Sequence, residues 1–164
     1  MKSVPLRALI ALGAVLVLGA VDVAIAGKER IRHDGEIVYL PLAPVDPRSL
    51  VQGDYMALRF ALARDIEARD MVARRAERDG ETGFAALTLD DRRVASLAAD
   101  AAAAPVKLRY RIREGQVWLG TNAFFFEEGT AARFQGARYG EFRVDRATGE
   151  AMLTGLRNAS LEAL

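Results

Sequence analysis

The sequence predicts an α+β protein, with a single, mostly antiparallel β domain that follows an N-terminal transmembrane helix. Residues 5–26 form a nearly uncharged apolar run. About eight later segments have the composition and alternation of strands, and they are joined by short connections, which favour antiparallel pairing. One charge-rich segment, residues 64–78, is typical of a helix. We therefore expect about eight strands and one main helix in one domain.

The N-terminal run supports two interpretations. Asp22 interrupts it near its end, and Ala24-Ile25-Ala26 has the small residues of a cleavage site. A cleaved secretory signal has these features. A retained anchor also fits, because about 20 apolar residues cross a bilayer. We divide the chain into residues 1–27, an anchor or signal segment, and residues 28–164, the β domain.

The charges of the chain bear on its location and partners. Basic residues flank both ends of the apolar run, so they specify orientation only weakly. Both interpretations of the run place the domain outside the cytoplasm. With a retained anchor, the protein would cross the inner (cytoplasmic) membrane once and contact lipid through its N-terminal helix. The nearly balanced charge, 23 basic against 22 acidic residues, gives no support for nucleic-acid binding. The absence of cysteine excludes disulfides and thiolate metal sites.

The first half of the domain is expected to contain two strands and the helix. Residues 36–43, EIVYLPLA, predict a strand that ends in a proline-rich turn. Residues 55–62, YMALRFAL, alternate as a strand does. Their expected core face comprises Met56, Leu58, Phe60 and Leu62. Residues 64–78 lack proline and Gly80 can end them, which predicts a surface helix.

The second half is expected to consist of strands. FAALTL and RVASLA flank Asp90-Asp91 and predict a hairpin. VKLRYRIR, residues 106–113, alternates most clearly, and Glu114-Gly115 turns it into QVWLGTNAFFF. A short helix or loop is expected in EEGTAARFQGA. RYGEFRVD and EAMLTGLR predict a last hairpin.

The polar face of residues 106–113 is a row of cations: Lys107, Arg109, Arg111 and Arg113. The row could meet anionic lipid head groups. It could instead pair across strands with Glu141 and Asp145, which alternate in a matching way. We favour the cross-strand pairing.

Residues 44–60, PVDPRSLVQGDYMALRF, are the candidate functional loop. Asp46 before a proline favours a turn, Gly53 can adopt positive φ, and Asp54 can accept backbone N–H groups where the strand begins. These features favour a strand-entry loop. Alternatively, Asp46 and Asp54 converge for acid/base chemistry or to bind a hard cation, beside Tyr55, which faces away from Leu58.

GDYMALRF resembles the signature of the GDYXXLXY family, Gly-Asp-Tyr-x-x-Leu-x-Tyr. Gly53, Asp54, Tyr55 and Leu58 match the signature, and Phe60 replaces its final tyrosine. PVDPRSL with Asp46 and Arg48, FFFEEG with Glu127, and ARYGEFRVD with Tyr139 also resemble the family. The resemblance implies a small, membrane-anchored bacterial protein that accompanies a multi-pass membrane protein, and it favours the anchor over the cleaved signal. It implies no reaction and no cofactor.

We therefore expect a non-enzymatic, extracytoplasmic accessory domain that interacts with an integral membrane protein, with no catalytic residue, cofactor or metal. The alternative is an enzyme or a metal- or ligand-binding domain that uses the loop with Asp46, Asp54 and Tyr55. A third possibility is a peptide-binding module that pairs through an exposed strand edge. Glu127 and Glu128 are interpreted as helix-start carboxylates or as ligands.

Overall fold

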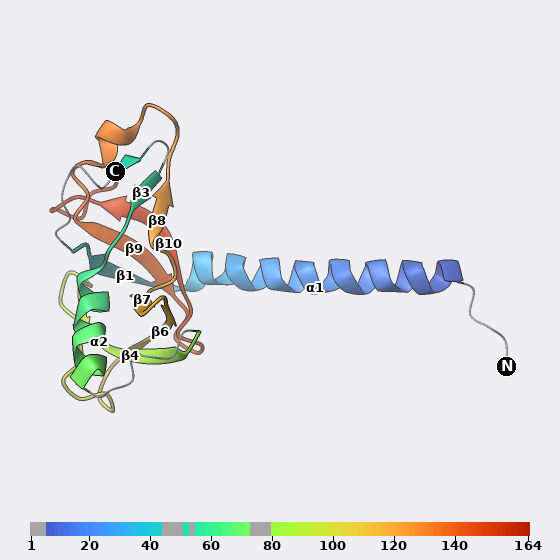
Figure 1. Ribbon diagram of the computed structural model, residues 1–164, viewed down its shortest axis with the longest axis horizontal. Helices are drawn as coiled ribbons and strands as arrows, with labels where there is room; N and C mark the ends of the chain where they lie inside the picture. Colours follow the sequence, from blue (N-terminus) through green and yellow to red (C-terminus); the bar gives the residue numbers. More distant parts are fainter. Residues whose placement is uncertain (1–5, 44–50, 53–54, 73–79) are drawn as a thin grey trace.

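The computed structural model describes residues 6–43, 51–52, 55–72 and 80–164. Helix α1 (Leu6–Asp34) projects as a single rod from one side of the β domain (Figure 1). The predicted α+β class, with antiparallel sheets after an apolar N-terminal helix, is confirmed. α1 continues without a break past the predicted boundary at residue 27.

Three sheets form the described part of the domain, and their strand pairs are antiparallel. The first has the order β1 (Glu36–Pro41), β9 (Tyr139–Val144) and β10 (Ala151–Arg157). The second has the order β2 (Val51–Gln52), β3 (Tyr55–Ala57) and β8 (Ala123–Phe125). The third has the order β5 (Ala95–Leu97), β4 (Thr82–Leu89), β6 (Val106–Arg113) and β7 (Gln116–Trp118).

The two predicted hairpins and the predicted turn at Glu114-Gly115 are confirmed, whereas the proline-rich turn after residue 43 lies outside the described residues. β4 pairs with β5, and β9 pairs with β10. Glu114 (φ 50) and Gly115 (φ 70) form the turn between β6 and β7. The segment after β8 contains a short 3-10 helix, η1 (Ala131–Phe134). The predicted strand at residues 36–43 becomes β1, the edge strand of the first sheet.

The segment from residue 55 to residue 62 differs from the prediction of one strand. β3 ends at Ala57, and helix α2 (Ala61–Val72) begins before the predicted start at residue 64. The expected core face is nevertheless buried: Met56, Leu58, Phe60 and Leu62 are each at most 3% exposed. The alternation persists because an isolated bridge joins Phe60 to Leu42, and Leu62 then lies in the first turn of α2. The predicted helix end at residue 78 lies outside the described residues.

The core lies between the sheets and α2. Its most buried large side chains include Leu40, Leu87, Leu108 and Phe142, each with 0% exposure. Ile66 of α2 belongs to the same cluster. Every second residue of β6 points into this core, so Lys107, Arg109, Arg111 and Arg113 are left on the outer face, as the alternation predicts.

Candidate functional site

The junction between α1 and the domain is short and closely packed. Only Gly35 separates the end of α1 from the start of β1. Ile31, on the last turns of α1, is 4% exposed. The Gly35 N–H donates to the Ile31 carbonyl (3.0 Å), and Arg143 Nη1 donates to the Gly35 carbonyl (3.1 Å). A Cβ atom at position 35 would lie 2.9 Å from the Arg143 Cβ, so the junction requires glycine.

Two ion pairs fasten α1 to the turn between β9 and β10. Lys28 Nζ pairs with Glu150 Oε1. Arg30 Nη2 lies 3.3 Å from Asp145 Oδ2. Exposed pairs contribute little to stability individually. Together with buried Ile31, however, they define the direction in which α1 leaves the domain.

Two carboxylates at the junction are held in their charged form. Arg146 donates to both oxygens of Glu36, at 2.6 and 2.7 Å. These hydrogen bonds lower the pKa of Glu36 below its usual 4.5, although partial burial opposes them. Backbone N–H groups of Ala147 and Thr148, with a smaller contribution from Arg30, lower the pKa of Asp145 below its usual 3.8. Glu36 and Asp145 therefore keep their ion pairs at neutral pH.

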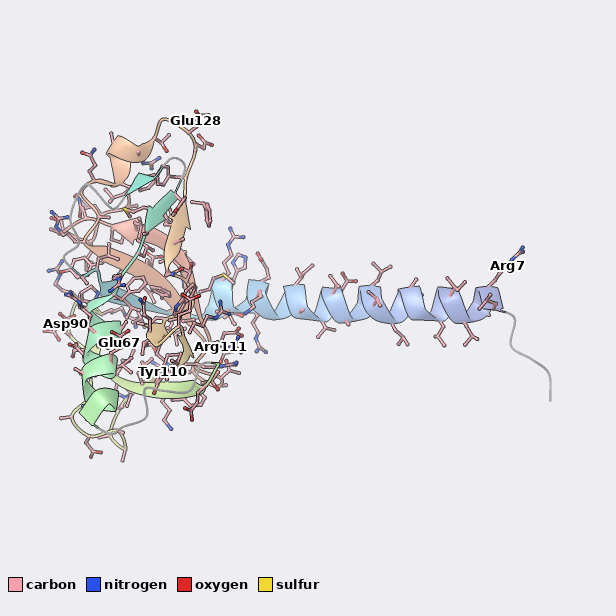
Figure 2. The ribbon with its side chains drawn as sticks, in the orientation of Figure 1. Arg7, Glu67, Asp90, Tyr110, Arg111 and Glu128 are labelled. Carbon is pink, nitrogen blue, oxygen red and sulfur yellow. The ribbon has the colours of Figure 1, made fainter. Side chains whose placement is uncertain are left out.

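An open hollow of ≈ 210 Å³ lies beside the junction and is lined by the polar face of β6. Its charged and aromatic lining comprises Lys28, Arg109, Tyr110, Arg111, Arg113, Trp118 and Glu150. The Arg113 guanidinium lies 5.0 Å from the centroid of the Trp118 ring. Figure 2 shows Arg111 near the base of α1, on the side of the domain from which α1 projects. We call the exposed row Lys107, Arg109, Arg111 and Arg113 the cationic face.

The favoured pairing of the cationic face with Glu141 and Asp145 is wrong. β6 lies between β4 and β7, whereas both acids belong to β9 or the turn after it. Asp145 pairs with Arg30. Glu141 of β9 pairs with Arg157 of β10, and these two strands are neighbours in the first sheet. Matching alternation cannot show which strands are neighbours, and here the sheet order separates the charges.

A buried cluster around Glu141 is not among the sites predicted from the sequence. This carboxylate is 7% exposed, and it accepts from Arg157 Nε and from Thr154 Oγ1 (3.1 Å). The register of β10 shifts between Leu153 and Gly155, so Thr154 is an extra residue, as in a β-bulge. The bulge brings Thr154 to Glu141. Gly155 inside the predicted strand is the one local signal for a bulge, but it does not indicate which side chain the bulge would bring to Glu141.

The signature residues within the described part of the chain have structural positions. Leu58 and Phe60 are buried, and the Leu58 N–H donates to the Asn122 carbonyl (2.7 Å). Tyr55 is 37% exposed, and its ring centroid lies 5.8 Å from that of Phe125 across the β3–β8 pair. Tyr139 is in the first sheet, opposite Pro41. Tyr55 and Tyr139 therefore belong to different sheets.

Asp46, Arg48, Gly53 and Asp54 lie outside the described residues, so the convergence of the two aspartates stays a prediction. Glu127 and Glu128 are exposed in the loop after β8. The helix-start interpretation of these two carboxylates is wrong, because η1 begins at Ala131 and has no acidic residue in its first turn. The Glu127 backbone carbonyl instead accepts from the Thr130 N–H (3.1 Å) and hydroxyl (2.6 Å). Among the residues that the structure describes, no three acidic or histidine side chains are grouped to hold a metal ion.

Comparison with curated proteins and with solved structures found no match. A family model described as GDYXXLXY protein matches residues 17–156. The matched region begins within α1 and ends in β10, so it includes the junction, the cationic face and the signature segment. The chain therefore belongs to the GDYXXLXY family.

Proposed function

We propose that this protein is a single-pass accessory protein of the inner membrane, which holds its β domain outside the cytoplasm and binds an integral membrane protein through α1. α1 is long and apolar enough to cross a bilayer. Its large apolar side chains, from Leu6 to Ile25, are exposed to at least 48%. The segment Leu6–Ala26 rises about 30 Å, which matches the bilayer core of about 30 Å.

Asp22 is the observation that supports a protein partner within the membrane. Its Cα lies about 6 Å inside the end of the apolar segment, by the rise of four residues to Ala26. An acidic side chain that faces lipid is unfavourable, by about 2.5–3.5 kcal/mol at the centre of the bilayer and less toward the interface. Among the described residues no basic side chain pairs with Asp22. A polar or cationic group from another membrane helix would remove this cost.

The face of α1 that carries Asp22 has room for a second helix. By helical spacing, the same face holds Ala11, Val15, Leu18, Gly19 and Ala26. Gly19 and the two alanines add little side-chain bulk to this face. Small residues let helices approach closely in lipid, and polar groups then bond across the interface. The Asp22 face of α1 therefore fits a partner helix.

Retention of α1 is tested by fractionation and by mass spectrometry of the mature protein. The full chain should resist carbonate extraction, and residues before Gly27 should be found in it. A mature chain that begins at Gly27 would disprove the anchor.

Orientation is tested with Ala101→Cys, which places a single cysteine on the exposed surface of a cysteine-free chain. We expect an impermeant maleimide to label it when only the outer face of the inner membrane is accessible, and labelling that requires lysis would reverse the topology.

The partner is tested by site-specific photo-cross-linking in membranes. A photoreactive residue at Val15 lies on the Asp22 face, and the same residue at Val17 lies on the opposite face, which makes a matched control. We expect a discrete adduct with a membrane protein from position 15 and none from position 17. Asp22→Ala should abolish the adduct. Equal adducts from both positions would disprove this interface, and so would an adduct that does not depend on Asp22. An adduct of twice the chain's mass would identify a second copy of this chain as the partner.

A further inference from the structure

We propose that the cationic face docks on the head groups of anionic phospholipids, so that the β domain lies against the bilayer instead of standing away from it. The proposal requires α1 in the membrane but no protein partner, and it can therefore fail independently of the partner proposed above. It rests on three properties of the surface around the base of α1, which are depth, charge and exposed aromatic side chains.

Depth follows from the geometry of α1. Lys28 lies two residues beyond Ala26, which places it about 3 Å past the end of the apolar segment. The head-group layer is about 5–7 Å thick on each side, from the difference between the whole bilayer and its core. Arg109, Arg111 and Arg113 line one hollow with Lys28. Because α1 enters β1 through Gly35 alone, this hollow is held at the depth of the head groups.

The charge of the hollow suits phosphate. Among the described residues that line it there are four cations, whereas the single carboxylate is Glu150, which already pairs with Lys28. Within the described part of the chain, neither Arg109 nor Arg111 forms an ion pair. The planar guanidinium group matches phosphate oxygens in a bidentate way. Arg109 and Arg111, which form no ion pair among the described residues, therefore complement an anionic lipid surface.

Exposed aromatic residues flank the cations. Phe84 of β4 is 62% exposed and lies directly opposite Arg109 in the β4–β6 pair, so both side chains are on the same face of the sheet. Phe125 is 75% exposed and lines a second hollow that also includes Lys28. Phenylalanine is common on the apolar side of elements that lie in the boundary between lipid and water. One exposed ring therefore lies beside Arg109 and another shares a hollow with Lys28, which is more consistent with a lipid surface than with free solvent.

Trp118 provides a direct probe, because it is the only tryptophan in the chain and lines the hollow. The full-length protein is placed in nanodiscs of phosphatidylcholine alone, or with about a quarter phosphatidylglycerol, with and without a lipid that carries a nitroxide on its head group. We expect nitroxide quenching of Trp118 to be stronger in the anionic nanodiscs. High salt should reduce this excess, because it screens exposed charges.

The arginines are tested with a charge-matched pair of variants. Arg109→Gln, Arg111→Gln and Arg113→Gln are combined in one variant. Arg64→Gln, Arg92→Gln and Arg133→Gln remove three exposed cations from α2, the β4–β5 turn and η1, and they form the control. We expect the first variant to weaken docking roughly 100-fold, at roughly fivefold per cation near an anionic surface. The control should dock as the wild type does.

Two outcomes would overturn the proposal. Equal quenching of the wild-type protein in zwitterionic and anionic nanodiscs would show that lipid charge is irrelevant, and this measurement decides the question even if the triple variant does not fold. Equal loss of quenching in both triple variants would show that total charge, and not the cationic face, controls docking. Each quenching value is a ratio with and without nitroxide, so a change in intrinsic Trp118 emission on loss of Arg113 does not affect it.

Discussion

The ring of Phe60 stands edge-on to the ring of Phe142, with the ring centroids 5.2 Å apart and the planes inclined by 73°. Gly140 makes this contact possible, because a Cβ atom there would lie 2.9 Å from Phe60 Cε1 and 3.0 Å from Phe142 Cε2. The contact joins the last position of the GDYXXLXY signature to the Tyr-Gly-Glu-Phe segment of β9. Two segments that resemble the family separately therefore meet in one part of the core.

Leu58→Ala should destabilise the protein by about 2–5 kcal/mol, because Leu58 is 3% exposed and its truncation leaves a cavity. Tyr55→Phe is the control, since Tyr55 lies at the surface of the second sheet. Thermal or denaturant unfolding of the full chain in a mild detergent measures both changes. A Leu58→Ala protein that melts like the wild type would contradict the core position of the signature.

Gly140→Ala should destabilise the protein by about 1–3 kcal/mol through overpacking against Phe60 and Phe142. Phe60→Leu removes the ring edge nearest to the new methyl group. The double variant should therefore be less destabilised than the sum of the two single variants, since residues in contact do not add independently. A strictly additive double-mutant cycle would show that Gly140 is required for some reason other than the Phe60 ring.

The sequence predicted those elements whose pattern is local. β6 alternates without interruption, and the turns at Glu114-Gly115 and around residues 146–149 are close in sequence to the strands that they join. The start of α2 was placed too late because Phe60 and Leu62 continue the alternation of β3 although the backbone changes from strand to helix. Burial was thus predicted more accurately than secondary structure in this segment.

The polar contacts could not be predicted, because they depend on which strands become neighbours. Glu141 alternates like a surface residue, but β9 is the middle strand of its sheet and buries it. Its partner Arg157 comes within reach through the pairing of β9 with β10 and the bulge at Thr154. The cations of β6 were assigned to the wrong acids for the same reason.

Arg157→Met should lower the free energy of unfolding by at most about 3–5 kcal/mol, because it leaves the buried Glu141 carboxylate without its counter-charge. The double variant Glu141→Leu with Arg157→Met should recover most of this loss, since apolar replacements of a buried pair are often tolerated. Chemical denaturation of the full chain measures both effects. A double variant that is less stable than Arg157→Met alone would show that the hydrogen bond from the Thr154 hydroxyl to the Glu141 carboxylate dominates the cluster, since the hydroxyl then keeps only the Glu141 backbone carbonyl as acceptor.

Acid should weaken the junction between α1 and the domain. The pKa values of Glu36 and Asp145 are lowered in the folded chain. Such groups contribute stability that is fully present above their unfolded pKa and is lost as the pH falls through the folded pKa. We expect the melting temperature to fall from about pH 5 toward about pH 3 as these carboxylates are protonated.

Arg146→Gln should make that fall shallower, because it removes the main cause of the lowered Glu36 pKa. Arg92→Gln is the charge-matched control, since Arg92 forms no ion pair with Glu36 or Asp145 among the described contacts. Melting curves of the two variants across the same pH range make the comparison. Parallel pH profiles for both variants and the wild type would exclude Glu36 as a source of the acid sensitivity.

Substitution by alanine should change stability in opposite directions at Gly27, within α1, and at Gly35, directly after α1. A Cβ atom at Gly27 would meet nothing within 4 Å, whereas one at Gly35 would press on Arg143 and on the backbone of Ile31. Gly27→Ala should stabilise the helix by roughly 0.5–1 kcal/mol, because alanine loses less backbone entropy there than glycine. Gly35→Ala should force α1 away from β9 and release Ile31 from its buried position.

Limited trypsin digestion of the full chain in detergent detects that release. Lys28, Arg30 and Arg32 offer cleavage sites on the last turns of α1, and cleavage there requires the helix to open locally. Gly35→Ala should therefore be cleaved at these sites faster than the wild type, and Gly27→Ala at the same rate or more slowly. Equal cleavage rates for Gly35→Ala and the wild type would show that the junction does not hold α1 in a fixed direction. The depth assigned to the cationic face would then lose its basis, because that depth follows from the direction of α1.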